Sequence, residues 1–209
     1  HSFAASILAI APLSAHAQDA IILDEIIVSG GLTPINADAY GRASSVVTAA
    51  EIERRQLRDA SEILRALPGV AVSRGGGPGG LTQVRLRGAE ANHVLVLIDG
   101  VEVSAPQTGE FDFGGLLAAD IDRVEVLRGP QSALYGSNAT AGVISITTKR
   151  GARDSFSYGA VVEGGSNATA DVTAYVRGGG DKIDASLSIT ARRDGGFDVS
   201  DDPNGRDDE

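Results

Sequence analysis

The chain has 209 residues, of which 18 are basic and 28 acidic, and its formal net charge is −10. This acidic balance argues against nucleic acid as a partner, because phosphate binding needs a basic surface. The sequence contains no Cys, which excludes disulfides, thiolate chemistry and zinc ribbons.

An apolar run from Phe3 to Leu13 comes first in the chain. Its length is typical of a signal peptide and is too short to span a bilayer as a helix. Ala15, His16 and Ala17 then supply a small-x-small cleavage pattern. We therefore expect residues 1–17 to be a signal peptide without its positively charged start, which fits the absence of Met. A buried helix is the alternative interpretation.

A β-prone segment rich in Ile and Val follows, from Asp24 to Gly30. An extended strand near a terminus can be captured by the sheet edge of another protein through strand addition. The segment is therefore a candidate for partner binding. The alternative is that it forms the first strand of the sheet of the next domain.

Two helical patterns follow a short β-type run over Ser44–Thr48. Each pattern starts with a capping box, Thr48 with Glu51 and Asp59 with Glu62. Apolar residues at helical spacing predict a core-facing stripe made of Ile52, Leu57, Ala60, Ile63, Leu64 and Leu67. The solvated face is expected to hold Arg54, Arg55, Arg58 and Arg65. Pro68-Gly69 is expected to end the second helix.

Two polar, Gly-containing segments form the candidate ligand-facing surface. The loop Arg74–Gly80 (RGGGPGG) separates the expected strands Val70–Ser73 and Leu81–Arg87. A phosphate cradle is rejected because no helix and no GK[ST] follow, whereas bare backbone can approach a ligand. In Ser104–Gly115, two Phe side chains either contact a ligand or pack in the core. The candidate residues are Arg74, Gly75, Gly76, Gly77, Pro78, Gly79, Gly80, Pro106, Gln107, Thr108, Phe111 and Phe113.

Three further strands are expected, at His93–Ile98, Ile121–Leu127 and Val143–Thr148. The first is almost continuously apolar, which is typical of a strand buried on both faces, and Asp99-Gly100 provides a turn after it. Ser132–Tyr135 can form one helical turn between the other two.

Beyond Phe156, apolar and polar residues alternate in three segments of about ten residues. This length and period match outer-membrane barrel strands with the apolar side outward, although a soluble sandwich has the same period. Three strands cannot close a barrel, and lipid does not tolerate an open edge, so we expect the chain to be part of a longer one. The acidic stretch Asp194–Glu209 is either solvated or a Ca²⁺ site with oxygen ligands.

Four motifs stand in sequence order: PGV at 68–70, VRLRG at 84–88, HVLVLIDGV at 93–101 and IDRVEVLRGPQSALYGSNATAGVISITTK at 121–149. Together they resemble the plug domain of TonB-dependent outer-membrane receptors, and the third motif favours cobalamin receptors over siderophore receptors. The resemblance implies an α+β plug, a small mixed sheet with short helices, followed by the start of an antiparallel transmembrane β-barrel with 22 strands in the family. The domains would be a signal peptide (1–17), a periplasmic segment (18–30), the plug (31–150) and the first three or so barrel strands (151–209).

The resemblance also implies a function and partners. The function would be energy-coupled uptake of a large scarce ligand, a corrinoid or a ferric siderophore, across the Gram-negative outer membrane. The partners would be TonB in the periplasm, the ligand, and outer-membrane lipid with lipopolysaccharide. Arg87 and Arg128 lie in LRG motifs and would face glutamates on the barrel wall; the alternative is that each simply ends a surface strand. The β-prone segment near the N-terminus resembles a TonB box, which would consist of Asp24, Glu25, Ile26, Ile27, Val28, Ser29 and Gly30.

Two other function classes stay open at this point. A non-transporting adhesin or signalling protein can use the same barrel, and an N-terminal signalling domain would favour it; the stretch between Gln18 and Asp24 holds none. A periplasmic hydrolase would need a catalytic set, but the three His are at positions 1, 16 and 93, two of them in the expected signal peptide. No Ser/His/Asp set can be assembled, so we expect no enzyme and no catalytic residue.

Overall fold

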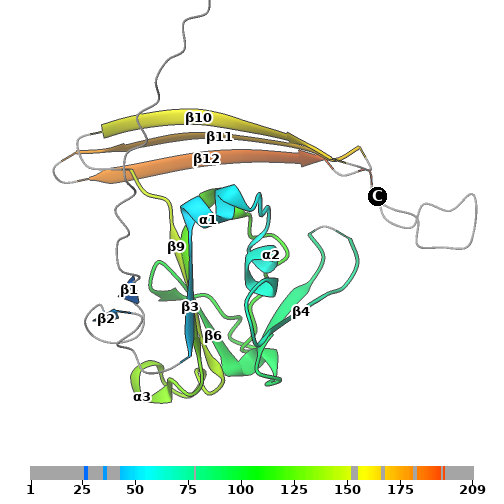
Figure 1. The fold of residues 1–209 in the computed structure, drawn as a ribbon, viewed down its shortest axis with the longest axis vertical. Coiled ribbons are helices and arrows are strands. Elements are labelled where there is room, and N and C mark those ends of the chain that lie inside the picture. The colour runs from blue at the N-terminus through cyan, green and yellow to red at the C-terminus, as the bar shows by residue number, and fades with distance from the viewer. Residues whose placement is uncertain are drawn as a thin grey trace, which may run out of the picture.

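A computed structural model describes residues 26–27, 35–36, 43–77, 79–151, 155–165, 168–180, 183–193 and 195. The expected signal peptide, Pro78 of the candidate loop and the acidic residues of 194–209 lie outside this part of the chain. Figure 1 shows a plug body of strands and short helices lying beneath a long, curved sheet.

A five-stranded mixed sheet forms the centre of the plug body, in the order β3-β8-β9-β6-β7. Strands β6 and β9 pair in parallel, and the other neighbours are antiparallel. The strands are β3 (Ser44–Thr48), β6 (Val94–Ile98), β7 (Val101–Glu102), β8 (Ile121–Arg128) and β9 (Gly142–Thr148). Each expected strand is present, and its ends differ from the expected ones by a residue or less.

Apolar clusters cover both faces of this sheet, which explains the unbroken apolar sequence of β6. On one face, helices α1 (Ala49–Arg54) and α2 (Ala60–Arg65) contribute Ile52, Ile63 and Leu64 to the larger cluster. On the other face a smaller cluster gathers Leu95, Leu97, Leu127, Ala139 and Val143, with Tyr135 of α3 (Ser132–Tyr135) packed against it. Two 3₁₀ turns, η2 (Ala91–His93) and η3 (Ala118–Asp120), lead into β6 and β8.

The two helices begin where the sequence predicts, but their caps differ from the prediction. Thr48 and Asp59 are the N-cap residues, yet neither side chain makes a capping hydrogen bond. Glu62 instead accepts a hydrogen bond from the Arg58 N–H, at 2.8 Å. The capping-box prediction is therefore correct in position and wrong in contact. For Asp59 the reason is that its carboxylate is used elsewhere, as described below.

Two small sheets stand apart from the central one. Strands β4 (Val70–Arg74) and β5 (Thr82–Leu86) form a hairpin that carries the loop Arg74–Gly80. Strands β1 (Ile26–Ile27) and β2 (Ile35–Asn36) pair antiparallel over two residues. Because this ladder is separate from the five-stranded sheet, Ile26 and Ile27 do not belong to a strand of the plug's central sheet.

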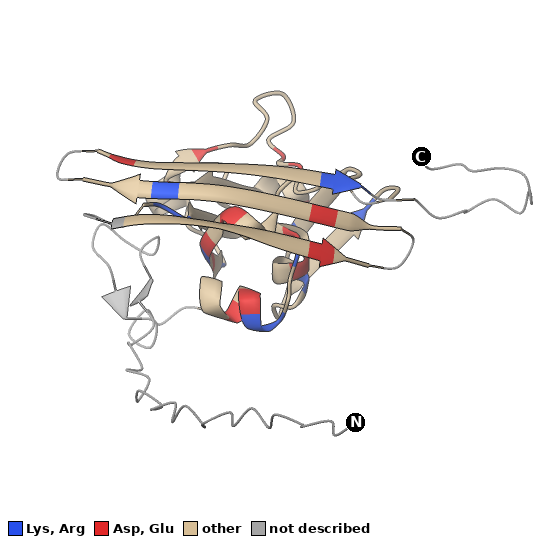
Figure 2. Ribbon diagram, turned by 90° about the horizontal axis from the view of Figure 1, so that it is seen from above, with Lys and Arg blue, Asp and Glu red and all other residues tan. Residues whose placement is uncertain are grey.

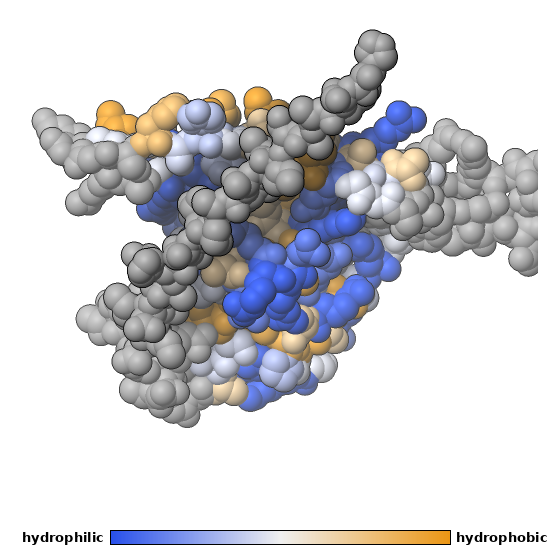
Figure 3. Space-filling model, turned by 45° about the horizontal axis from the view of Figure 1, so that its top comes forward, coloured by the Kyte–Doolittle hydropathy of each residue, from blue (hydrophilic) through white to orange (hydrophobic). Residues whose placement is uncertain are grey.

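The C-terminal strands β10 (Ser155–Gly164), β11 (Ala170–Gly179) and β12 (Asp184–Arg193) form an antiparallel sheet, here called the wall sheet. Large apolar side chains are exposed on its outer face, whereas Asp171 and Thr173 are buried on the side of the plug. Figure 3 shows hydrophobic residues along the top of this sheet and hydrophilic ones below it. The predicted alternation, apolar outward and polar inward, is confirmed. In the described part of the chain, no helix has the length and apolarity needed to cross a membrane.

Candidate functional site

The plug body and the wall sheet meet through charged side chains. Figure 2 looks down on the wall sheet lying across the plug, with charged positions on both. Ser188 Oγ on β12 donates to Asp120 Oδ2 at 2.7 Å, and Arg177 Nη2 on β11 lies 3.8 Å from Asp120 Oδ1. A third contact joins Arg58 Nε and Glu163 Oε2 at 3.5 Å. The plug therefore rests on the polar inner face of the strands.

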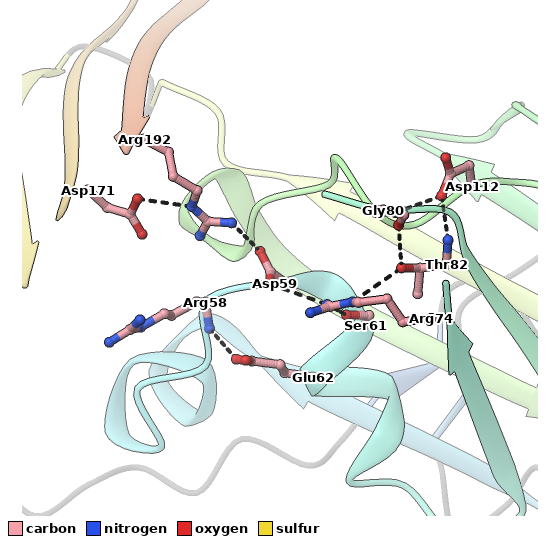
Figure 4. A network of polar contacts seen from close by, with 11 residues as sticks. Arg58, Asp59, Ser61, Glu62, Arg74, Gly80, Thr82, Asp112, Asp171 and Arg192 are labelled. Atoms are coloured by element: carbon pink, nitrogen blue, oxygen red, sulfur yellow. Dashed lines mark hydrogen bonds and ion pairs between the residues drawn. The ribbon is translucent and has the colours of Figure 1, made fainter. Parts of the chain in front are cut away.

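Asp59 makes the most buried of these contacts. Its residue surface is only 5% exposed. Oδ1 accepts from Arg192 Nη1 of β12 at 3.2 Å, and Oδ2 lies 3.5 Å from Arg74 Nη2 of the plug. Arg192 Nε also donates to Asp171 Oδ1 of β11 at 2.9 Å. Figure 4 shows Asp59 between the two guanidinium groups, which compensate its charge as burial requires.

Arg74 is half-buried, and its guanidinium makes polar contacts within the plug. Its Nη2 donates to Ser61 Oγ at 2.8 Å, and its Nε lies 3.4 Å from Thr82 Oγ1. With Asp59 as a third partner, the guanidinium is held by the plug itself. Because Asp59 already neutralises this charge, the expectation that Arg74 faces a ligand stays a prediction.

The structure brings the two candidate ligand-facing segments together. Asp112 Oδ1 accepts from the Thr82 N–H at 2.8 Å and from the Gly114 N–H at 2.9 Å, which ties Ser104–Gly115 to the β4–β5 hairpin. Thr82 Oγ1 also donates to the carbonyl of Gly80 at 2.8 Å. The exposed candidates are Gly75, Gly76, Gly79, Pro106, Gln107 and Thr108, while Gly77 and Gly80 are half-buried.

The two phenylalanines of the second segment belong to the core. Phe113 is 2% exposed, and Phe111 is half-buried with its ring 4.8 Å from that of Phe113 in an edge-to-face arrangement. Both rings pack on the larger apolar cluster. The prediction that Phe113 faces a ligand is wrong, because burying a large ring in the core is the more favourable outcome.

Arg87 and Arg128 lie next to each other, and neither forms an ion pair with an acid among the described residues. Arg128 is 7% exposed and donates from Nη2 to Ser45 Oγ at 2.7 Å, while its buried Nε finds no partner in the same part of the chain. Burial and the charge of Arg87 lower the pKa of Arg128. Both side chains come within 4 Å of a Cβ placed on Gly69.

The described wall strands do not supply carboxylates to this pair. The wall sheet contacts Asp120, which directly precedes β8, whereas Arg128 ends that eight-residue strand. At roughly 3.3 Å per residue the two ends are about 25 Å apart. The expectation that Arg87 and Arg128 face glutamates on the wall therefore stays a prediction about other strands.

A cavity of about 420 Å³ lies between α1 and the wall sheet. Its plug side includes Ile52, Leu57 and Lys149, and its wall side includes Thr173 and Tyr175. This mixed lining can hold water between the two layers. Within the described ranges, no group of three or more His, Asp and Glu could hold a metal ion.

Sequence reasoning did not identify Asp59 as an interface residue. It predicted Asp59 only as a helix cap, because both local signals, the spacing to Glu62 and the apolar stripe, point there. The partner Arg192 lies 133 residues further along the chain. A lone Asp in a helix-start pattern gives no sign of so distant a contact.

Comparisons with known proteins agree with this architecture. Residues 37–143 match the family described as TonB-dependent Receptor Plug Domain. The Vitamin B12 transporter BtuB of Vibrio vulnificus (strain YJ016) is 40% identical over 133 residues, covering 64% of this chain and 22% of that protein. The chain thus spans about a fifth of the length of this curated relative.

Solved receptors show the same fold. The siderophore receptor PirA from Acinetobacter baumannii is 28% identical, with a TM-score of 0.56 over 71% of this chain and 24% of that one. The ferripyoverdine receptor of the outer membrane of Pseudomonas aeruginosa is 21% identical, with a TM-score of 0.67 over 80% of this chain and 22% of that one, and is similar in fold alone. Since the family match covers over half of the chain and includes β3, β6, β7, β8 and the start of β9, the chain belongs to the TonB-dependent receptor plug family, whose members are receptors of the Gram-negative outer membrane and not enzymes.

Proposed function

We propose that this chain is the plug and the first wall strands of a receptor that takes up a large, scarce ligand across the outer membrane, with energy supplied through TonB. The observation that carries the proposal is the polar plug–wall interface. The plug rests on the polar face of strands whose other face is apolar and exposed. Strands with one lipid-compatible face and one polar face line a barrel interior, and a plug held there by polar contacts closes it.

Cobalamin or another corrinoid is the favoured ligand. Higher identity to a vitamin B12 transporter than to the siderophore receptor above supports this choice. The exposed loops support it as well. Their candidate residues are Gly, Pro, Gln and Thr, and the one cation, Arg74, is neutralised inside the plug. Such a surface suits a neutral, amide-rich corrinoid better than an anionic ferric siderophore, because the siderophore's charge would gain no cationic partner here.

The ligand is tested by titrating the full-length receptor with cyanocobalamin and, separately, with ferric enterobactin. We expect cyanocobalamin to bind at micromolar concentration or below. If ferric enterobactin binds and cyanocobalamin does not, the ligand is instead a ferric siderophore. Likeness to a solved siderophore receptor supports this alternative. Repeating the titration with and without Ca²⁺ tests our further proposal that carboxylates of 194–209 bind calcium through oxygen ligands.

TonB coupling is proposed for the segment Asp24–Gly30. Ile26 and Ile27 are extended in β1, the backbone form that strand addition needs. Replacing Ile27 with Pro removes an N–H donor and should abolish uptake while leaving ligand affinity unchanged. Ile27→Val, which keeps the donor and the β-propensity, is the matched control. Uptake that persists in the Pro variant would overturn the assignment of the TonB box. A parent receptor that binds ligand without taking it up would favour the alternative, a non-transporting surface or signalling protein.

Arg87 and Arg128 are proposed to meet carboxylates on wall strands other than β10–β12. A buried guanidinium next to a second cation is unfavourable unless an acid comes close. Removing the partner of a buried charge typically costs about 3–5 kcal/mol, so the plug should be less stable outside its barrel. The apolar outer face of the wall sheet would contact lipid, including lipopolysaccharide.

A further inference from the structure

We propose that Asp59 is a positioning residue that fixes both candidate ligand-facing loops to the barrel wall. The role of these loops as ligand-facing rests on the proposed function, whereas the link between the loops and the wall rests on contacts alone. Four charged residues alternate along this link, in the order Asp171, Arg192, Asp59 and Arg74. They come from β11, from β12, from the start of α2 and from the end of β4 (Figure 4).

The link continues from Arg74 into both loops. Arg74 is the first residue of the loop Arg74–Gly80, and its Nε approaches Thr82 Oγ1, which in turn donates to the Gly80 carbonyl. The Thr82 N–H donates to Asp112, which lies in the second segment. One series of hydrogen bonds and ion pairs therefore joins the wall to both ends of the first loop and to the second segment.

Burial distinguishes this link from the other plug–wall ion pairs. The side chains of Arg58 and Glu163 are 39% and 43% exposed, so water and salt screen their attraction. Asp59 and Asp171 are both buried, and electrostatic attraction is stronger where water is excluded. Loss of one member would leave an uncompensated buried charge, so the four residues are expected to act together.

The chemistry of position 59 points the same way. An N-cap requires only a short side chain with one acceptor, and Ser, Thr or Asn would serve. Asp59 makes no capping hydrogen bond. It uses both carboxylate oxygens, one toward the wall through Arg192 and one toward the loop through Arg74. A negatively charged group is needed at this position for the link and not for the helix.

A spin label at Gly75 tests the proposal in the full-length receptor, in the membrane and without ligand. Gly75 has ordinary φ, and a Cβ there would meet only the Leu81 carbonyl oxygen, at 3.9 Å, so Gly75→Cys is sterically tolerated. The label reports the mobility of the first loop next to Arg74. Asp59→Asn and Arg192→Gln are the test variants. Glu163→Gln, which removes the exposed pair on the same wall sheet, is the matched control.

We expect Asp59→Asn and Arg192→Gln each to shift the spectrum from an immobilised toward a mobile component, and Glu163→Gln to leave it unchanged. The double variant should be no more mobile than either single variant, because both break the same link. A label that stays immobilised in Arg192→Gln overturns the proposal, whatever Asp59→Asn does. If the Asp59→Asn receptor does not accumulate, Arg192→Gln still decides, since it leaves the plug sequence intact. The measurement uses no ligand, so failure of cyanocobalamin binding is a separate result.

Discussion

Gly142 is the position where a single added methyl group should disturb the plug most clearly. It begins β9 and pairs with Val94 of β6 on one side and with Arg128 of β8 on the other. A Cβ at this position would lie 2.6 Å from Leu86 Cδ1 and closer still to the Leu127 carbonyl oxygen. The Leu86 side chain can rotate away. The Leu127 carbonyl cannot, because it belongs to the backbone of β8, which pairs with β3 on one edge and with β9 on the other. Gly142→Ala must therefore push the backbones of β8 and β9 apart where the two strands pair.

Overpacking of this kind typically costs about 1–3 kcal/mol. We expect the upper part of that range, because the obstacle is backbone. Since about 1.4 kcal/mol is a factor of ten, a cost of about 2–3 kcal/mol should make local opening roughly 30- to 150-fold more frequent. Hydrogen exchange of the β8 and β9 amides in the full-length receptor measures this directly. Gly115→Ala is the control, as a Cβ there meets nothing within 4 Å. Exchange rates in Gly142→Ala equal to those of the parent would refute the reasoning.

Three other substitutions test the core, the wall and the pH response. Phe113→Ala should destabilise the plug by about 3–5 kcal/mol, measured by urea titration of the receptor with proteolysis as the readout. Under folding conditions the variant should keep its ligand affinity. Lost affinity with unchanged stability would show that Phe113 contacts the ligand. Val162→Arg, on the exposed outer face, should lower the stability of the receptor by about 2–4 kcal/mol and reduce the amount of folded receptor in the membrane. Val161→Arg, on the cavity side, should lower the stability by less. Equal losses in the two variants would contradict the assigned faces. Burial alone would raise the pKa of Asp99, but hydrogen bonds from the Thr148 hydroxyl and N–H and the nearby charge of Arg150 outweigh it, so the pKa lies below 3.8. The stability that ionised Asp99 contributes is present above pH 3.8 and is lost as the pH falls through the lowered pKa. The difference in melting temperature between Asp99→Asn and the parent should therefore vanish in acid. A difference that stays constant with pH would contradict this.

Local patterns sufficed to predict the helices and the longer strands of the plug and the wall, but not β2, β7 or the two 3₁₀ turns. The apolar run Val94–Ile98 forms β6, and the three alternating segments form strands of ten residues each, because hydrophobic periodicity depends on near neighbours in the chain. The N-cap positions Thr48 and Asp59 followed from the same kind of short-range signal. The family likeness also depended on motifs that can be read in order along the chain.

Only the tertiary structure decided where polar and aromatic side chains point. Phe113 is in the core because the second candidate segment folds back onto the β4–β5 hairpin, which no local pattern encodes. Asp59 leaves its capping role because Arg192, 133 residues away, is brought to it when the wall sheet docks on the plug. The physical reason is that ion pairs and burial depend on distance in space. Secondary structure depends on the spacing of residues along the chain, and this spacing can be read directly from the sequence.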